Sequence, residues 1–192
     1  LTAIRGISLD IYKGESLAIV GESGSGKSVF TKTFMGMLDK NGKVTKGEIL
    51  YKGMDLAKFS SEKDWLKIRG REVAMVFQDP MTSLNPLKTV GKQIQEALEL
   101  HQNLHGRAAR EKTIEILSDV GISEPERRYK QYPHEFSGGM RQRAVIATAI
   151  ACNPNILICD EPTTALDVTI QAQIIELLEQ LQKKYRLTII YI

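Results

Sequence analysis

A glycine-rich segment near the start of the sequence has the residue types and the spacing of a phosphate-binding loop. It lies between a short apolar run, 16–20, and a stretch with helical spacing, 27–38. Its glycines let the backbone curl so that successive N–H groups point at one anion, and the helix start adds its positive end. In such a loop the lysine reaches the β- and γ-phosphates of a nucleotide, and the hydroxyl that follows binds Mg²⁺. The segment runs Gly21, Glu22, Ser23, Gly24, Ser25, Gly26, Lys27 and Ser28, so Lys27 is the predicted phosphate-binding lysine and Ser28 a predicted metal ligand.

A pair of adjacent acids, Asp160 and Glu161, follows a second apolar run, 156–159. Side chains alternate along a strand, so neighbouring acids at its end diverge. We expect Asp160 to hold Mg²⁺ through its water shell and Glu161 to act as the general base toward the attacking water. Acids also follow strands simply because loops are polar, so this interpretation depends on the phosphate loop.

A third segment, Ser137-Gly138-Gly139, precedes an apolar helical run, 144–151. Ser137 is a favourable N-cap, and the two glycines leave N–H groups uncovered at a helix start, which predicts a second anion site. The alternative is a capped helix with a flexible approach. A chain with two such sites either binds two phosphates or shares one nucleotide between two subunits.

The elements that must position these residues follow from the hydrophobic pattern. Apolar runs predict strands, and longer segments with helical spacing predict helices, whereas 79–132 contains no convincing strand. We therefore predict an α/β fold in which a P-loop core of the RecA-like type, 1–78 and 152–192, carries an inserted α-helical subdomain, 79–151. The expected strands are 4–11, 16–20, 48–51, 73–77, 156–159 and 187–192, and the expected helices are 27–38, a turn around Trp65, 90–100, 108–120, 144–151 and 170–184.

The order of these motifs resembles an ABC ATPase over essentially the whole chain. Two further matches are Gln78, which follows a predicted strand, and Ala165-Leu166-Asp167, which follows the two acids. The resemblance implies that ATP with Mg²⁺ is bound, that Gln78 contacts the metal and the attacking water, and that Asp167 contacts the opposite subunit of a dimer.

The same resemblance assigns the third segment to the partner's site. It implies that Ser137, Gly138, Gly139 and Met140 form a signature that docks in trans on the ATP held by a second ATPase subunit, identical or different. It further implies transmembrane permease subunits as partners, and a peripheral position on the cytoplasmic face of the membrane.

Two longer stretches, 78–86 and 132–140, resemble the ATPases of oligopeptide and dipeptide permeases. Phe136 and Met140 replace the leucine and glutamine of the commonest signature, and both replacements resemble that peptide-importer branch. Importers for nickel and some sugars share much of this pattern. An ATP-gated clamp on nucleic acid is disfavoured because the insertion has no sustained heptads and no basic stripe, and retention of Glu161 argues against an inert regulatory subunit.

The bulk composition fits a globular protein and sets limits on its partners. The 192 residues are 42% apolar and 26% charged with a net charge of +3, which is too weak a bias to argue for nucleic acid or an anionic membrane. No apolar run approaches the roughly 18 residues that span a bilayer. Cys152 and Cys159 have no zinc or disulfide spacing, so we expect both to be buried packing residues.

Both ends of the sequence indicate a piece of a longer protein. The sequence starts at Leu1 without a methionine and stops inside an apolar run. We therefore expect the γ-phosphate-sensing histidine and the adenine-stacking aromatic residue of the family to lie outside it. Of the remaining residues, we expect Trp65 to pack in a core, His134 to stabilise a loop, and Lys67, Arg69 and Arg71 to form a solvated face.

Overall fold

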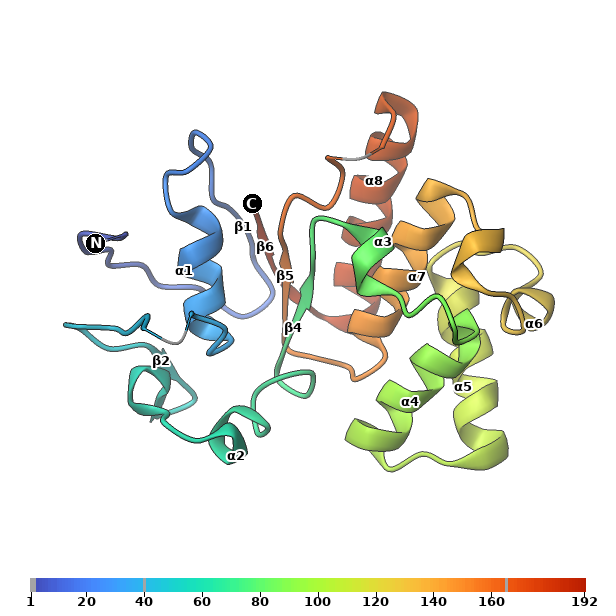
Figure 1. Cartoon of the computed structure of the whole chain (residues 1–192), viewed down its shortest axis with the longest axis horizontal. Coiled ribbons are helices and arrows are strands. Elements are labelled where there is room, and N and C mark those ends of the chain that lie inside the picture. Colours follow the sequence, from blue (N-terminus) through green and yellow to red (C-terminus); the bar gives the residue numbers. More distant parts are fainter. Residues whose placement is uncertain (1–2, 40, 165) are drawn as a thin grey trace.

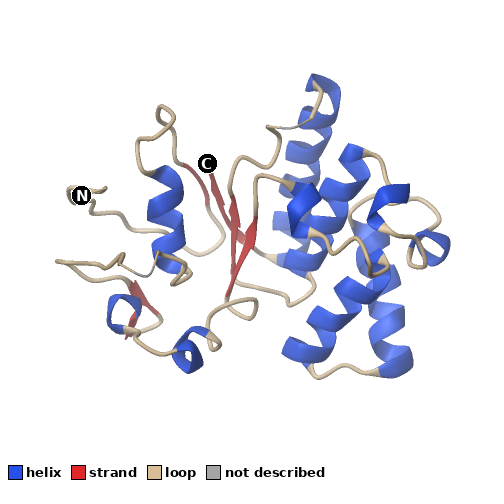
Figure 2. Ribbon diagram, in the orientation of Figure 1, coloured by secondary structure: helices blue, strands red, loops and turns tan. Residues whose placement is uncertain are grey.

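A parallel sheet lies at the centre of the molecule. The computed structural model describes residues 3–39, 41–164 and 166–192, and within them four parallel strands pair in the order β1-β6-β5-β4. Figure 2 shows these strands between two groups of helices and loops. Val73 pairs with Ile156, Cys159 with Tyr191, and Ser16 with Ile189, which fixes the register. The strands are β1 (Ser16–Ala18), β4 (Val73–Val76), β5 (Ile156–Cys159) and β6 (Thr188–Tyr191).

The side chains of the central strands alternate between two cores, one on each face of the sheet. One core takes Val73, Met75, Ile158 and Ile190 from the strands. The other core takes the neighbouring residues, namely Ala74, Val76, Leu157, Cys159 and Ile189. Both faces are covered, which explains why these strands are continuous apolar runs in the sequence.

One face is covered by α1 (Lys27–Phe34) and by a small unit that follows it. That unit contains the antiparallel pair β2 (Leu50–Tyr51) and β3 (Met54–Asp55), a 3₁₀ turn η1 (Leu56–Lys58) and the short helix α2 (Glu62–Trp65). Trp65 packs in this core, as predicted, and Ser61 caps α2 by accepting a hydrogen bond from the Asp64 N–H.

The other face carries the helices of residues 80–150 together with α8 (Figure 1). Their buried residues recur at helical spacing; Val90, Ile94 and Leu98, for example, are fully buried on α4. The helices are α3 (Pro80–Ser83), α4 (Val90–Gln102), α5 (Gly106–Asp119), α6 (Pro125–Arg128), the 3₁₀ turn η2 (Pro133–Glu135), α7 (Gly138–Ile150) and α8 (Val168–Tyr185).

The α/β fold with a helical segment between β4 and β5 matches the prediction, and the structure corrects two details. Residues 4–11 contain no strand, because they pair with no neighbour in the described part of the chain. Arg69 is not a solvated residue: its guanidinium donates to the carbonyl oxygens of Met35 and Gly36, just past the end of α1, at 2.6 and 2.9 Å. Arg69 therefore joins the end of α1 to the small unit, because a cation complements the free carbonyl groups at the end of a helix.

Both cysteines are buried, as expected, and burial raises the pKa of each thiol. His134 is exposed and stacks on Tyr132, in keeping with a role in the loop. No helix among the described residues combines the length and the apolar character needed to cross a membrane. Two residues named in the predictions lie outside the described residues, namely Leu1, the first residue of the predicted core, and Ala165, the first residue of the Ala165-Leu166-Asp167 motif.

Candidate functional site

The loops that carry the predicted chemistry leave the same edge of the sheet. Because the strands are parallel, their carboxyl ends meet there, which is where open α/β sheets bind ligands. The phosphate loop follows β1, Gln78 follows β4, and the two acids follow β5. Residues separated by more than a hundred positions are thereby brought into contact.

The phosphate loop ends directly in the first turn of α1. Gly24 and Gly26 have φ of +79° and +95°, a left-handed conformation that glycine adopts without strain, and Gly26 is the N-cap of α1. The Lys27 ammonium donates to the carbonyl oxygens of Gly21 and Glu22, both at 2.7 Å, so it lies over the loop. The loop therefore presents a cation and free N–H groups at one helix start, a combination suited to phosphate. The other members, Ser23 and Ser25, are exposed in the same turn.

Ser28, in the first turn of α1, meets Asp160 at the end of β5. The Ser28 hydroxyl donates to Asp160 Oδ1 at 3.3 Å. Burial raises the pKa of the Asp160 carboxyl above its ordinary value; the Ser28 hydrogen bond and the charges of Lys32 and Lys27 offset part of this rise, whereas Glu161 adds to it. A hydroxyl and a carboxylate are the oxygen donors that Mg²⁺ takes in proteins, so this pair fits that ion.

Glu161 faces a different partner from its neighbour, as the strand geometry predicts. Its carboxylate oxygen Oε2 accepts hydrogen bonds from Gln78 Nε2 at 2.7 Å and from Thr164 Oγ1 at 3.0 Å. The backbone N–H of Asp160 donates to the carbonyl oxygen of Val76, the last residue of β4, and that of Glu161 donates to Ile192 O, just beyond β6, so the two N–H groups point to opposite neighbours in the sheet.

Glu161 also has an unusual backbone conformation, with φ of +46°. A non-glycine residue in the left-handed region costs about 1–3 kcal/mol and persists where the surroundings impose it, often at functional sites. Here the Ile192 carbonyl and the Gln78 amide hold the residue in place. Gln78 is hydrogen-bonded to the predicted base, and its contact with a metal stays a prediction.

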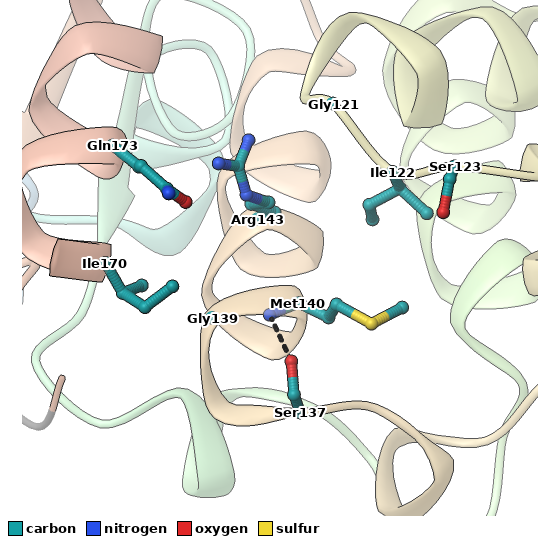
Figure 3. Close-up of a pocket in the computed structure, with 9 residues that line it drawn as sticks. All are labelled: Gly121, Ile122, Ser123, Ser137, Gly139, Met140, Arg143, Ile170 and Gln173. Atoms are coloured by element: carbon teal, nitrogen blue, oxygen red, sulfur yellow. Dashed lines mark hydrogen bonds between the residues drawn. The ribbon is translucent and has the colours of Figure 1, made fainter. Parts of the chain in front are cut away.

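The signature segment forms the start of α7. Ser137 is its N-cap and accepts a hydrogen bond from the Met140 N–H at 3.3 Å (Figure 3). A Cβ added to Gly139 would lie 2.9 Å from Cγ2 of Ile170, so the absence of a side chain lets α8 pack directly on α7. Gly138 has more room, because an added Cβ would meet only a Leu166 methyl carbon at 3.7 Å.

The signature and the phosphate loop do not meet within the chain, because α7 and α1 cover opposite faces of the sheet (Figure 1). Asp167 is the N-cap of α8 and accepts a hydrogen bond from the Ile170 N–H at 3.1 Å. The first turns of α7 and α8 thus contact each other through Gly139 and Ile170.

Comparison with known proteins decides the family. The family model described as "ABC transporter" matches residues 4–164, from before the phosphate loop to beyond the two acids. This chain belongs to the ABC transporter family. Solved ABC cassettes share the fold: the ATP-binding cassette MJ0796, in a dimeric post-hydrolysis state bound to ADP and Pi, has a TM-score of 0.84 at 30% identity, with 98% of this chain and 78% of that one covered.

Curated relatives of this ABC chain are peptide-transport proteins. The oligopeptide transport ATP-binding protein AmiE of Streptococcus pneumoniae is 59% identical over 100% of this chain and 54% of its own length. The dipeptide transport ATP-binding protein DppD of Bacillus subtilis is 56% identical over 99% of this chain and 57% of its own length. The ABC chain therefore spans about half the length of these relatives.

The structure adds two residues to the site of this ABC chain that sequence reasoning missed. Thr164 donates to the predicted base, and its position three residues after Glu161 was the only sequence signal for it. Lys32 acts electrostatically on Asp160, from one helical turn beyond Ser28 on α1. That spacing places both residues on one face of the helix, so the helical pattern could have indicated Lys32.

Proposed function

We propose that this chain is the ATP-binding and ATP-hydrolysing part of an ABC importer for oligopeptides or dipeptides. The observation that carries the proposal is the pair of contacts at one edge of the sheet, Ser28 with Asp160 and Gln78 with Glu161. They join the phosphate loop, the metal-binding donors and a candidate base in one place. The peptide-transport names of relatives at 56–59% identity support the substrate class.

In the proposed reaction the phosphate loop holds ATP and Glu161 takes a proton from the attacking water. Gln78 orients Glu161 through its hydrogen bond. Ser28 and Asp160 would hold Mg²⁺, and the ion would supply charge neutralisation at the phosphates. Glu161 is held through its backbone N–H by Ile192 and through Oε2 by Gln78 and Thr164, so its carboxylate has a defined orientation.

The signature implies a shared site in the proposed mechanism. The start of α7, with its Ser137 cap and two glycines, presents N–H groups on the face of the sheet opposite α1. It therefore serves the ATP held by a second ATPase subunit, and Asp167 contacts that subunit. Closure of the dimer moves the helical subdomain, 79–151, and drives separate permease subunits from the cytoplasmic face of the membrane.

The test uses the protein at its natural length with Glu161→Gln, ATP and Mg²⁺, and measures mass by light scattering. We expect a monomer without nucleotide and a dimer with ATP, and we expect Ser137→Arg to abolish the dimer while monomeric ATP binding persists. A protein that binds ATP but remains monomeric would refute the shared site. Reconstitution with its permease subunits in liposomes tests the substrate class, because peptide should stimulate ATP hydrolysis and nickel should not.

A further inference from the structure

The end of α5 contacts both α7, which carries the signature segment at its start, and α8. Asp119, its last residue, accepts hydrogen bonds from Lys184 Nζ at 2.6 Å and from the Tyr185 hydroxyl, both at the end of α8. The next residue, Val120, accepts a hydrogen bond through its carbonyl oxygen from Arg143 Nη1 of α7 at 2.7 Å. Residues 119–121, which we call the α5 junction, therefore tie α7 to α8.

Gly121 completes the α5 junction by leaving room for Arg143. It has φ of +73°, and a Cβ added to it would lie 2.7 Å from Arg143 Nη1. Any other residue would be strained there and would push the guanidinium aside. The cation also lies where the last carbonyls of α5 carry partial negative charge, which favours it electrostatically.

Arg143 lies one helical turn beyond Gly139, on the same side of α7. Figure 3 shows its guanidinium between Gln173 of α8 and the Gly121–Ser123 segment, in the wall of a cavity of about 240 Å³ that Ser137 and Met140 also line. The first two turns of α7 are thus fixed at two points, by Ile170 against Gly139 and by the α5 junction against Arg143.

We propose that Arg143 is a positioning residue that sets the direction of the signature segment toward the ATP of the partner subunit. This inference rests on the proposed function, because it presumes that the signature binds that nucleotide. Arg143 touches neither the phosphate loop nor the acids; it acts through α7. Its loss leaves ATP binding by the monomer intact and weakens the closure of the dimer.

The experiment measures the ATP concentration that gives half-maximal dimer by light scattering, at fixed protein concentration, for the natural-length protein with Glu161→Gln. Arg143→Met keeps an unbranched side chain that reaches the position of Nε and removes the guanidinium donors, so we expect a rise of about tenfold, which corresponds to about 1.4 kcal/mol. Arg143→Lys keeps one donor and should restore part of the loss. The affinity of the monomer for a labelled ATP should stay within about twofold of the parent, because loss of the contact between Arg143 and Val120 leaves the phosphate loop unchanged.

Arg107→Met is the matched control, because it removes an arginine whose side chain is 91% exposed and paired only at the surface of α5. It should dimerise at the ATP concentration of the parent. If Arg143→Met also does so, the positioning role is wrong. If Arg143→Met is unfolded, Gly121→Ala tests the same contact, because the added Cβ would lie 2.7 Å from Arg143 Nη1, and an unchanged dimer would overturn the proposal. Failure of the parent to dimerise with ATP overturns the proposed function itself, before Arg143 is tested.

Discussion

Glu161→Gln offers the sharpest test of the assigned chemistry, because the structure predicts a change in basicity with little change in geometry. Gln78 and Thr164 both donate to the same oxygen, Oε2, at 2.7 and 3.0 Å. A glutamine that places its amide oxygen there keeps both hydrogen bonds, and its NH₂ group takes the position of Oε1. The variant therefore loses the oxygen that can take a proton from water and retains its anchors.

The expected loss follows from that single change. General base catalysis contributes about 10²- to 10⁴-fold to a rate, or about 2.7–5.4 kcal/mol of barrier. We expect the single-turnover rate of ATP hydrolysis to fall by that factor, whereas the affinity for ATP stays within about twofold because the phosphate loop is untouched.

The assay mixes the natural-length protein in excess over radiolabelled ATP with Mg²⁺ and follows the release of phosphate. Glu176→Gln is the matched control, because Glu176 is an exposed residue of α8 that accepts a single hydrogen bond from Gln180. It should hydrolyse ATP at the parental rate. A Glu161→Gln protein that keeps more than about one-tenth of the parental rate would show that Glu161 is not the base.

Three further predictions concern neighbouring residues. Lys27→Met removes the ammonium from the phosphate loop. Equilibrium binding should show the affinity for ATP reduced about 100-fold, because two charged hydrogen bonds to ATP of about 1.5 kcal/mol each are lost. An unchanged affinity would contradict the loop assignment. Because the pKa of Asp160 is raised by burial, its ionised form destabilises the fold, and stability falls as pH rises through that pKa. Asp160→Asn should therefore raise the Tm of the nucleotide-free protein at pH 7, while Mg²⁺-dependent hydrolysis is lost; a lower Tm would refute this account. Gly139→Ala should cost about 1–3 kcal/mol of stability by overpacking against Ile170. Adding Ile170→Ala should restore the Tm in thermal melts without restoring ATP-driven dimerisation. Recovery of both the Tm and dimerisation would mean that Gly139 matters only for packing.

Local pattern was sufficient for the elements with strong signals. The helices at 90–100, 108–120 and 170–184 were found to within a few residues, because their buried side chains recur with the helical period. The strand expected at 4–11 failed, because a strand needs a partner and an apolar alternation does not supply one. Arg69 was assigned to solvent for a similar reason, since its partners are carbonyl groups more than thirty residues earlier in the chain.

By itself, the sequence determined the chemical groups and the elements that carry them. The phosphate loop, the acids after an apolar run and the capped glycines before a helix are local patterns, because each depends on residues adjacent in the chain. Only the tertiary structure decided which of these groups meet. The parallel strand order puts Ser28 beside Asp160 and Gln78 beside Glu161, and it leaves the signature on the opposite face of the sheet, where Arg143 and Ile170 fix its direction. Such contacts depend on the register and packing of segments far apart in sequence, which no local pattern encodes.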